Sequence, residues 1–117
     1  IAGMLENVPR EKLIGGVPFY TRLWTEAGDG TITSKAMGIA EEKRWVDNNQ
    51  VELPWQADTA QYYGEVQTSD GAQFLWMEEE RSLKEKMNVI RQNDLAGVAC
   101  WKLGFEDSAA WDSIQWN

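Results

Sequence analysis

Aromatic and charged side chains follow two apolar runs that lie near opposite ends of the chain. The run GVPFYTRLW carries Tyr20, Arg22 and Trp24, and the run GVACWKLGFE carries Trp101 and Glu106. An indole ring stacks on flat ligand surfaces, and a guanidinium group offers five donors to hydroxyl and carbonyl oxygens. These residues could form two walls of one binding site, or they could be core aromatics with an arginine in a surface ion pair.

The amino-acid composition excludes several kinds of catalytic and metal-binding site. The chain has no histidine and one cysteine, Cys100. The usual general base, the Ser-His and Cys-His nucleophile pairs and the commonest zinc ligand are therefore missing. Cys100 lies in an apolar run, and we interpret it as a buried structural thiol because reactive thiols need electropositive, partly exposed surroundings. We expect no metal site and no cofactor.

Charge and hydropathy limit the partners. The 117 residues carry a net charge of −8, which disfavours nucleic acid and anionic membrane surfaces because both need a basic patch. No stretch approaches the roughly 20 apolar residues of a membrane span, and no signal peptide is visible. Seven tryptophans are unusually many for a chain of this length. They indicate either a core that is filled by large aromatic side chains or a surface that stacks on flat ligands. Since the chain opens at Ile1 without an initiator methionine, we expect a piece of a longer protein.

Two continuous apolar segments predict the strands that would position these side chains. Residues 12–20 and 95–103 lack the alternation of a half-exposed strand. We therefore expect both strands to be buried on both faces, as in a parallel sheet covered by helices. Pro18 favours a strand end or edge in the first segment, because proline donates no hydrogen bond to a strand ladder.

The middle of the chain predicts a small α+β unit. Ser34 is the expected N-cap of a helix that runs to about Asn48. Asp70-Gly71 predicts a hairpin, since this pair supplies the positive φ angles of a tight turn. The expected strands of the unit are residues 51–55, 59–67 and 72–78. Core packing of so small a unit would use most of its aromatic residues Trp55, Tyr62 and Tyr63.

A helix and a closing segment complete the pattern. Ser82 and Glu85 fit a capping box for a helix that runs to about Gln92. Its expected inner face consists of Leu83, Met87 and Ile90. We expect the acidic residues 78–80 to be a solvated helix entry rather than an acid pair, and residues 108–116 to form a short closing helix or coil. The order strand, α+β unit, helix, strand predicts one βαβ crossover with an insertion, within a larger parallel sheet.

Three segments, in this order, resemble motifs of family 18 glycoside hydrolases. GVPFYTRLW is similar to the family's seventh-strand signature, Gly-x-Pro-x-Tyr-Gly-Arg followed by an aromatic residue, although Thr21 replaces its second glycine and leaves the direction of Tyr20 open. FLWMEEERSLKEK is similar to the end of the family's inserted α+β domain, and LAGVACWKLGFED resembles its eighth strand. The resemblance covers nearly the whole chain and is strongest to the bacterial branch of spore-cortex and cell-wall N-acetylglucosaminidases.

The resemblance implies an α/β fold, the C-terminal portion of a (β/α)8 TIM barrel. Residues 1–26 would be the strand 7 region, residues 27–78 the inserted α+β unit, and residues 79–117 helix 7, strand 8 and the closing segment. It also implies an extracellular glycosidase, at the cell wall or spore surface. Such an enzyme hydrolyses β-linked N-acetylglucosamine polymers, peptidoglycan or chitin, by substrate-assisted retention.

The family's catalytic motif, Asp-x-x-Asp-x-Asp-x-Glu, does not occur in the 117 residues. The resemblance places the acid glutamate, and the aspartate that orients the sugar's acetamide, upstream of Ile1. We therefore expect no catalytic residue in this chain and no hydrolysis by the chain alone. The alternative is a non-catalytic carbohydrate-binding module of the chitinase-like lectin type, and the sequence upstream would discriminate between the two.

The family's binding residues carry over onto the two apolar runs. Trp101 would be the floor of the subsite that holds the sugar to be cleaved, and Tyr20 and Arg22 would line the same cleft. Trp24 would either line the cleft edge or cap the inserted unit. Glu106 follows the eighth strand, where a loop carboxylate could touch sugar hydroxyls.

The expected partner is an N-acetylglucosamine-containing polysaccharide, and not a nucleic acid. The two strands also have only one crossover helix to cover them. We therefore expect the fragment to self-associate through these strands, by edge pairing or by exchange of elements.

Overall fold

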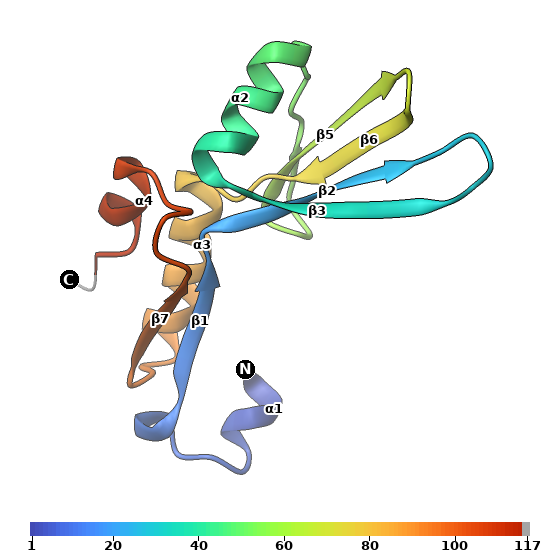
Figure 1. Ribbon diagram of the computed structural model, residues 1–117. Helices are drawn as coiled ribbons and strands as arrows, with labels where there is room; N and C mark the ends of the chain where they lie inside the picture. The colour runs from blue at the N-terminus through green and yellow to red at the C-terminus, as the bar shows by residue number, and fades with distance from the viewer. Residues whose placement is uncertain (116–117) are drawn as a thin grey trace.

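The computed structural model of the chain describes residues 1–115. Its elements form two groups (Figure 1): a two-stranded parallel sheet with helices beside it, and a five-stranded antiparallel sheet with one helix. The molecule is elongated, with extents of 49 × 30 × 25 Å. The chain therefore has a mixed α/β fold, as the sequence predicts.

The parallel pair consists of β1 (Ile14–Pro18) and β7 (Gly97–Trp101), with Ile14 opposite Gly97 and Pro18 opposite Trp101. α3 (Glu80–Gln92) precedes β7 in the chain and contacts β1 and α4 (Ser108–Ser113). The expected crossover is confirmed, because β1 and β7 are parallel neighbours with α3 between them in the chain. The closing helix α4 is shorter than expected, and Trp116 lies outside the described residues.

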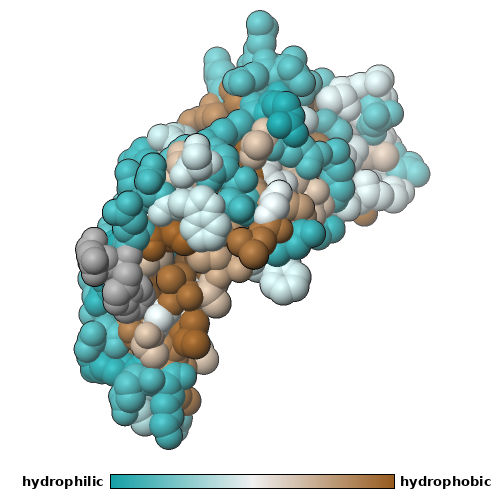
Figure 2. Space-filling view, turned by 60° about the vertical axis from the view of Figure 1, so that its left-hand side comes forward, coloured by the Kyte–Doolittle hydropathy of each residue, from teal (hydrophilic) through white to brown (hydrophobic). Residues whose placement is uncertain are grey.

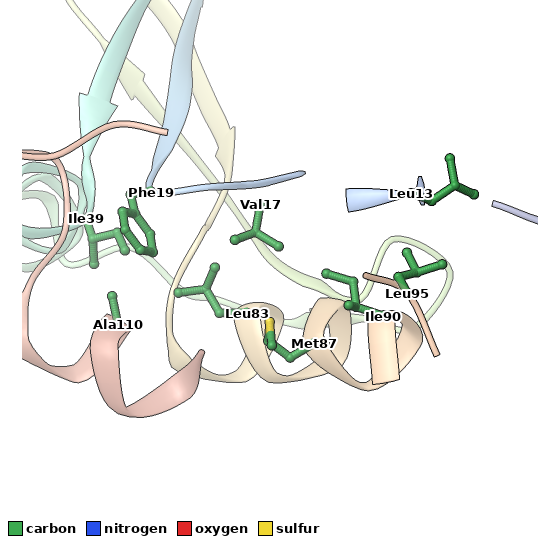
Figure 3. Close-up of a cluster of buried hydrophobic side chains, with 9 residues drawn as sticks. All are labelled: Leu13, Val17, Phe19, Ile39, Leu83, Met87, Ile90, Leu95 and Ala110. Carbon is green, nitrogen blue, oxygen red and sulfur yellow. The ribbon is translucent and has the colours of Figure 1, made fainter. Parts of the chain in front are cut away.

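The first hydrophobic core lies between this pair and its helices (Figure 3). Leu83, Met87 and Ile90 of α3 pack in one cluster with Val17 of β1 and Phe19, so the predicted inner face of the helix is confirmed. The buried members of the cluster are Leu13, Val17, Phe19, Ile39, Leu83, Met87, Ile90, Leu95 and Ala110.

The other face of β1 and β7 is open, so the expectation of two buried faces is wrong. Val17 is buried, but Ile14 is 64% exposed and Trp101 is 66% exposed. The preceding elements, α1 (Ala2–Leu5) and the 3-10 turn η1 (Arg10–Lys12), contain no buried residue. Within residues 1–115, helices therefore cover only one face of the pair.

The second group is a five-stranded antiparallel sheet in the order β3-β2-β6-β5-β4. Its elements are β2 (Tyr20–Glu26), β3 (Ile32–Gly38), α2 (Ile39–Asn49), β4 (Trp55–Gln56), β5 (Gln61–Thr68) and β6 (Gly71–Trp76). The predicted hairpin is confirmed, with Thr68 opposite Gly71 at its end. Residues 20–26, which the resemblance assigns to the strand 7 region, form β2 and pair within this sheet.

One face of this sheet forms a second hydrophobic core with α2. The buried members are Leu23, Met37, Trp45, Leu75 and Met77. Tyr62 packs against this cluster. Trp55 lies edge-on to Tyr62 at a centroid distance of 5.0 Å, so both aromatics contribute to the unit's packing.

The expected helix start at Ser34 is wrong. Ser34 lies in β3 opposite Trp24, and its hydroxyl oxygen accepts a hydrogen bond from Arg22 Nε at 2.9 Å. The helix begins only after Gly38, which has no side-chain cap. Pairing of β3 with β2 along its whole length overrides the local capping preference of serine. The strand expected at 51–55 is likewise reduced to Trp55–Gln56.

The start of α3 differs from its predicted capping box. Glu79 is the N-cap, and its carboxylate accepts from the N–H groups of Arg81 and Ser82, both at 2.9 Å. Ser82 occupies the third helical position and accepts from the Glu79 N–H. The acidic residues 78–80 are therefore not a solvated entry: Glu78 is 2% and Glu79 is 8% exposed.

Two buried carboxyl groups join α2 to the start of α3. Glu42 Oε1 accepts the N–H of Glu78 at 2.9 Å, while Glu42 Oε2 is buried with no partner. Burial raises the pKa of Glu42 to about 10, so this carboxyl group is protonated at neutral pH. Glu78 instead accepts hydrogen bonds from Lys86 at 2.7 Å and from Ser82 at 3.0 Å.

A substitution at Gly38 tests the joint between the two groups. The N–H of Ile39 donates to the Phe105 carbonyl at 2.7 Å, and a Cβ on Gly38 would lie 2.9 Å from that oxygen. We expect Gly38→Ala to lower the free energy of unfolding by about 1–3 kcal/mol, because backbone atoms must move. Gly28→Ala, where nothing lies within 4 Å, is the matched control and should stay within about 0.5 kcal/mol in urea unfolding. Equal effects at both positions would contradict the close packing of this joint.

The pH dependence of stability tests the protonated state of Glu42. The folded chain keeps this proton up to about pH 10, whereas the unfolded chain loses it near pH 4.5, so stability falls as pH rises through this window. Glu42→Gln keeps an acceptor for Glu78 and cannot ionise. We expect the variant to gain stability over the unsubstituted chain between pH 5 and 9, by at most about 1.4 kcal/mol per pH unit. Glu41→Gln, at a side chain that is 44% exposed, is the control. A gain that does not change with pH would contradict the assignment.

Candidate functional site

The C-terminal ends of β1 and β7 form the floor of a hollow of about 390 Å³, called here the Trp101 hollow. It is lined by Gly16, Val17, Pro18, Tyr20, Ala99, Cys100 and Trp101. Trp101 is 66% exposed, so it is not a core tryptophan. Cys100 is only partly buried, and burial raises the pKa of its thiol, which disfavours a nucleophilic thiolate.

A second hollow of about 410 Å³, called here the Trp24 hollow, is lined by residues of the five-stranded sheet and by Lys86 of α3. Tyr20, Arg22 and Trp24 all line it, because alternate residues of β2 project to the same side of the sheet. Further lining residues are Thr59, Gln61, Trp76, Glu78 and Lys86. The structure therefore brings three of the five predicted site residues into one place.

Tyr20 connects the two hollows. It lines both of them, and its ring lies 6.1 Å from the ring of Phe105, between centroids. Thr21, which stands where the family signature has glycine, donates its hydroxyl to the Trp76 carbonyl and has no positive φ angle. The backbone after Tyr20 is therefore an ordinary strand, and the tyrosine faces the hollows.

Arg22 and Trp24 are held by the strands on either side of β2. Arg22 is exposed, and its guanidinium group donates to the hydroxyl and carbonyl oxygens of Ser34. Trp24 is half-buried, opposite Ser34 on one side and Phe74 on the other. Trp24 thus lies on the wall of the Trp24 hollow.

The loop after β7 does not bring its carboxylates into either hollow. Glu106 accepts the N–H of Gly104 at 2.7 Å and holds the loop's own turn. Asp107 is the N-cap of α4, where it accepts from Ala110, and it also pairs with Lys43 at 2.6 Å. Both carboxylates thus have structural partners, and Glu106 is separate from the other predicted site residues.

The base of the Trp24 hollow is an ion pair. Lys86 Nζ lies 2.7 Å and 3.0 Å from the two carboxylate oxygens of Glu78, and Gln61 donates to Glu78 at 3.0 Å. Burial raises the pKa of Glu78, and the Lys86 ammonium opposes that shift. A hydrogen-bonded charge pair is thus fixed beneath the aromatic walls.

No motif in the sequence indicates that Trp76, Gln61, Glu78 and Lys86 line a hollow. Trp76 could be found from the alternation at the end of β6, because Leu75 before it and Met77 after it are buried whereas Trp76 is half-buried. The lining by Gln61 and Lys86 depends on how the two groups of elements meet, which no local pattern reports.

The two hollows combine exposed or half-buried rings with hydrogen-bonding side chains. This combination suits a ligand that has flat apolar faces and hydroxyl groups at its rim. Among residues 1–115, no cluster of three acidic, cysteine or histidine side chains could hold a metal ion. The helices in this part of the chain are also too short or too polar to span a membrane.

Comparisons with known proteins place this arrangement in a family. The sequence model described as glycosyl hydrolases family 18 matches residues 2–106. The cortical fragment-lytic enzyme of Bacillus subtilis is 25% identical over 109 residues, which is 92% of this chain and 25% of that protein. The chain thus spans about a quarter of the length of this curated relative.

Solved structures resemble the fold closely. A chitinase from Chromobacterium violaceum matches with a TM-score of 0.85 and 22% identity over 96% of this chain and 34% of that chain. The spore cortex-lytic enzyme SleL of Bacillus megaterium matches with a TM-score of 0.82 and 23% identity over 94% of this chain and 26% of that chain. The fold therefore resembles part of these larger folds, and the described residues do not contain a complete barrel. Because the family model matches most of its residues, the chain belongs to the glycosyl hydrolases of family 18.

Proposed function

We propose that the chain is part of a glycosidase that hydrolyses β-linked N-acetylglucosamine polymers by substrate-assisted retention. In this proposal the chain supplies one cleft wall and a sugar-stacking platform, and not the acid glutamate, whose motif is absent from the 117 residues. The observation that carries the proposal is Trp101: an exposed indole at the C-terminal end of a parallel strand, beside Tyr20. Active sites of barrel enzymes are built at this end of the strands.

The proposal assigns β1, α3 and β7 to strand 7, helix 7 and strand 8 of a (β/α)8 barrel. Three observations support it: the parallel pairing of β1 and β7, the crossover through α3, and the match to about a quarter to a third of larger proteins. Because β2 pairs with β3 and β6, residues 20–26 would belong to the inserted unit, so this unit would span residues 20–78 and not only 27–78. The strand 7 region would then be residues 1–19, and the remaining barrel elements residues 79–117.

The substrate class follows from the relatives and from the site. The matched proteins are a chitinase and cortex-lytic enzymes, and chitin and peptidoglycan share β-linked N-acetylated sugars. An extracellular location, at the cell wall or spore surface, is part of the same proposal. Trp101, Tyr20, Arg22 and Trp24 would contact the sugar, whereas Glu106 is left out because it lines neither hollow.

A non-catalytic carbohydrate-binding module is the second candidate. It rests on the same stacking and hydrogen-bonding groups, and the sequence upstream of Ile1 would discriminate between the two candidates. The two candidates make the same prediction for binding by this chain, and both exclude turnover by the chain alone.

Substitution of Trp101 tests the platform. We expect Trp101→Ala to weaken binding of N-acetylglucosamine oligomers about ten-fold, because the stacking surface is lost, and Trp101→Phe to retain part of it. Trp111→Ala is the matched control: Trp111 is 44% exposed, lies edge-on to Phe19 and lines neither hollow. Isothermal calorimetry measures the affinities. Equal losses for the two alanine variants, or no binding by the unsubstituted chain, would contradict the proposal.

The open face of the parallel pair predicts self-association of the chain. Figure 2 shows apolar side chains gathered over the limb that holds β1 and β7, and Ile14 is 64% exposed there. A two-stranded sheet has two open edges and is marginally stable by itself. We expect sedimentation velocity at micromolar concentration to show dimers or larger species, which Ile14→Lys shifts towards monomer. Ile32→Lys, at a side chain 57% exposed in β3, should have no such effect. A monomer at all concentrations would contradict this prediction.

A further inference from the structure

The loop after β7, residues 102–107, connects the exposed Trp101 to α4. Its two halves differ in burial: residues 102–104 are exposed, with Leu103 75% exposed, whereas residues 105–107 are half-buried. Figure 1 shows the loop passing the start of α2 on its way to α4. The half-buried residues are therefore the ones that could anchor the loop to another element.

Two residues of α2 hold this half of the loop. The N–H of Ile39, at the first position of α2, donates to the Phe105 carbonyl at 2.7 Å. Lys43 Nζ lies 2.6 Å from Asp107 Oδ2. Because residues four apart on a helix lie on the same side, one side of α2 supplies both contacts.

The Phe105 carbonyl replaces the capping side chain that α2 lacks. The first N–H groups of a helix have no partner within the helix, and Gly38, at the N-cap, has no side chain to accept them. A Cβ on residue 38 would lie 2.9 Å from the Phe105 carbonyl oxygen, so glycine permits the contact. This one hydrogen bond therefore caps the helix and anchors the loop.

The ion pair of Lys43 and Asp107 is better ordered than a typical surface pair. Asp107 Oδ1 accepts the N–H of Ala110, which fixes the carboxylate, while Oδ2 accepts from Lys43. The two side chains are 34% and 22% exposed, against 64% and 44% in the 3.4 Å pair of Lys35 and Glu41. Burial alone would raise the pKa of Asp107, but the hydrogen bonds from Lys43 and Ala110 lower it overall. Surface ion pairs contribute little unless their geometry is well fixed, which is the case here.

Phe105 connects these anchors to the Trp101 hollow. Its ring lies 6.1 Å from that of Tyr20, between centroids, and its N–H donates to the Lys102 carbonyl at 3.1 Å. Trp101 itself is held from the other side, since its carbonyl accepts the Phe19 N–H at 2.7 Å. The exposed stretch between them is thus held at two points, one beside β1 and one on α2.

We infer that α2 of the inserted unit positions the Trp101 platform, because it holds the loop after β7 at Phe105 and Asp107. Lys43 is a positioning residue in this inference, since it contacts the loop and not the ligand. Without the pair of Lys43 and Asp107, the loop keeps its attachment beside β1 but loses part of that on α2, and Trp101 gains mobility. A ligand then has to order the platform on binding, which lowers the affinity. For this last step the inference rests on the proposed function.

Asp107→Asn removes the ion pair and keeps the cap of α4. The asparagine Oδ1 still accepts the Ala110 N–H, because asparagine is as good an N-cap as aspartate. Its amide nitrogen then faces the Lys43 ammonium and cannot accept a hydrogen bond from it. Glu80→Gln is the matched control, since Glu80 is the other carboxylate on Lys43, at 2.7 Å, and belongs to α3 instead of the loop.

NMR of the ¹⁵N-labelled chain measures the effect without a ligand. Asp107→Asn should lower the heteronuclear NOE of residues 102–105 and shift the indole N–H signal of Trp101, whereas Glu80→Gln should change neither. The indole signal of Trp45, whose N–H donates to Gln73 at 3.2 Å, is the internal control. No change with Asp107→Asn, or equal changes with Glu80→Gln, would overturn the inference.

Variants of Lys43 make the same test from α2. Lys43→Met keeps the aliphatic stem without the charge and should reproduce both changes in the NMR signals. Lys43→Arg keeps a cation and should produce neither. Thermal unfolding by circular dichroism verifies that the variants fold. A Lys43→Met chain that folds and has an unchanged loop would overturn the inference.

Calorimetry with a disaccharide of N-acetylglucosamine tests the step from the loop to the platform. We expect Asp107→Asn to weaken binding about three- to ten-fold, the cost of ordering one large side chain, and Glu80→Gln to stay within about two-fold. If the unsubstituted chain binds no saccharide, the proposed function fails, while the NMR result still decides the inference. If Asp107→Asn makes the loop mobile and leaves the affinity unchanged, the loop does not position the platform and the inference is overturned.

Discussion

The parallel register of β1 and β7 determines where the rest of the chain lies. Phe19, directly after β1, donates its N–H to the Trp101 carbonyl at 2.7 Å, and its ring is completely buried in the first core. The two strands therefore end at one edge, and Tyr20 and Trp101 line the same hollow although they are far apart in sequence. Parallel strands need a long connection, and in this chain that connection holds the whole inserted unit.

Contacts between the two groups of elements hold the walls of the hollows in place. Gly38 permits close approach to Phe105, whose carbonyl accepts the first N–H of α2. Lys43 of α2 reaches Glu80 at 2.7 Å and Asp107 at 2.6 Å, and so connects the starts of α3 and α4. The residues that line the Trp24 hollow come from both sides of this joint, so these contacts fix their relative positions.

Local patterns in the sequence predicted the elements whose environment is set locally. Asp70-Gly71 supplies the backbone angles of its hairpin, and the apolar residues of α3 repeat at helical spacing. The wrong expectations concern residues whose surroundings come from distant segments. Ser34 pairs with β2 instead of capping a helix, and Glu78 is buried because Lys86 and Gln61 reach it. Such partners lie outside the short stretch of sequence over which a periodic pattern is read.

The two exposed apolar surfaces differ in composition, and this separates their roles. The open side of the parallel pair carries exposed Ile14 near one end and exposed Trp101 at the other. Around Ile14 it is aliphatic, and burial of aliphatic side chains is favourable only when another packed surface excludes water. The face that carries Trp24 and Trp76 combines rings with Arg22 and Gln61, so it can hold a ligand by stacking and directed hydrogen bonds. A surface of the first kind suits a permanent protein neighbour. A surface of the second kind suits a ligand that has flat apolar faces and hydroxyl groups.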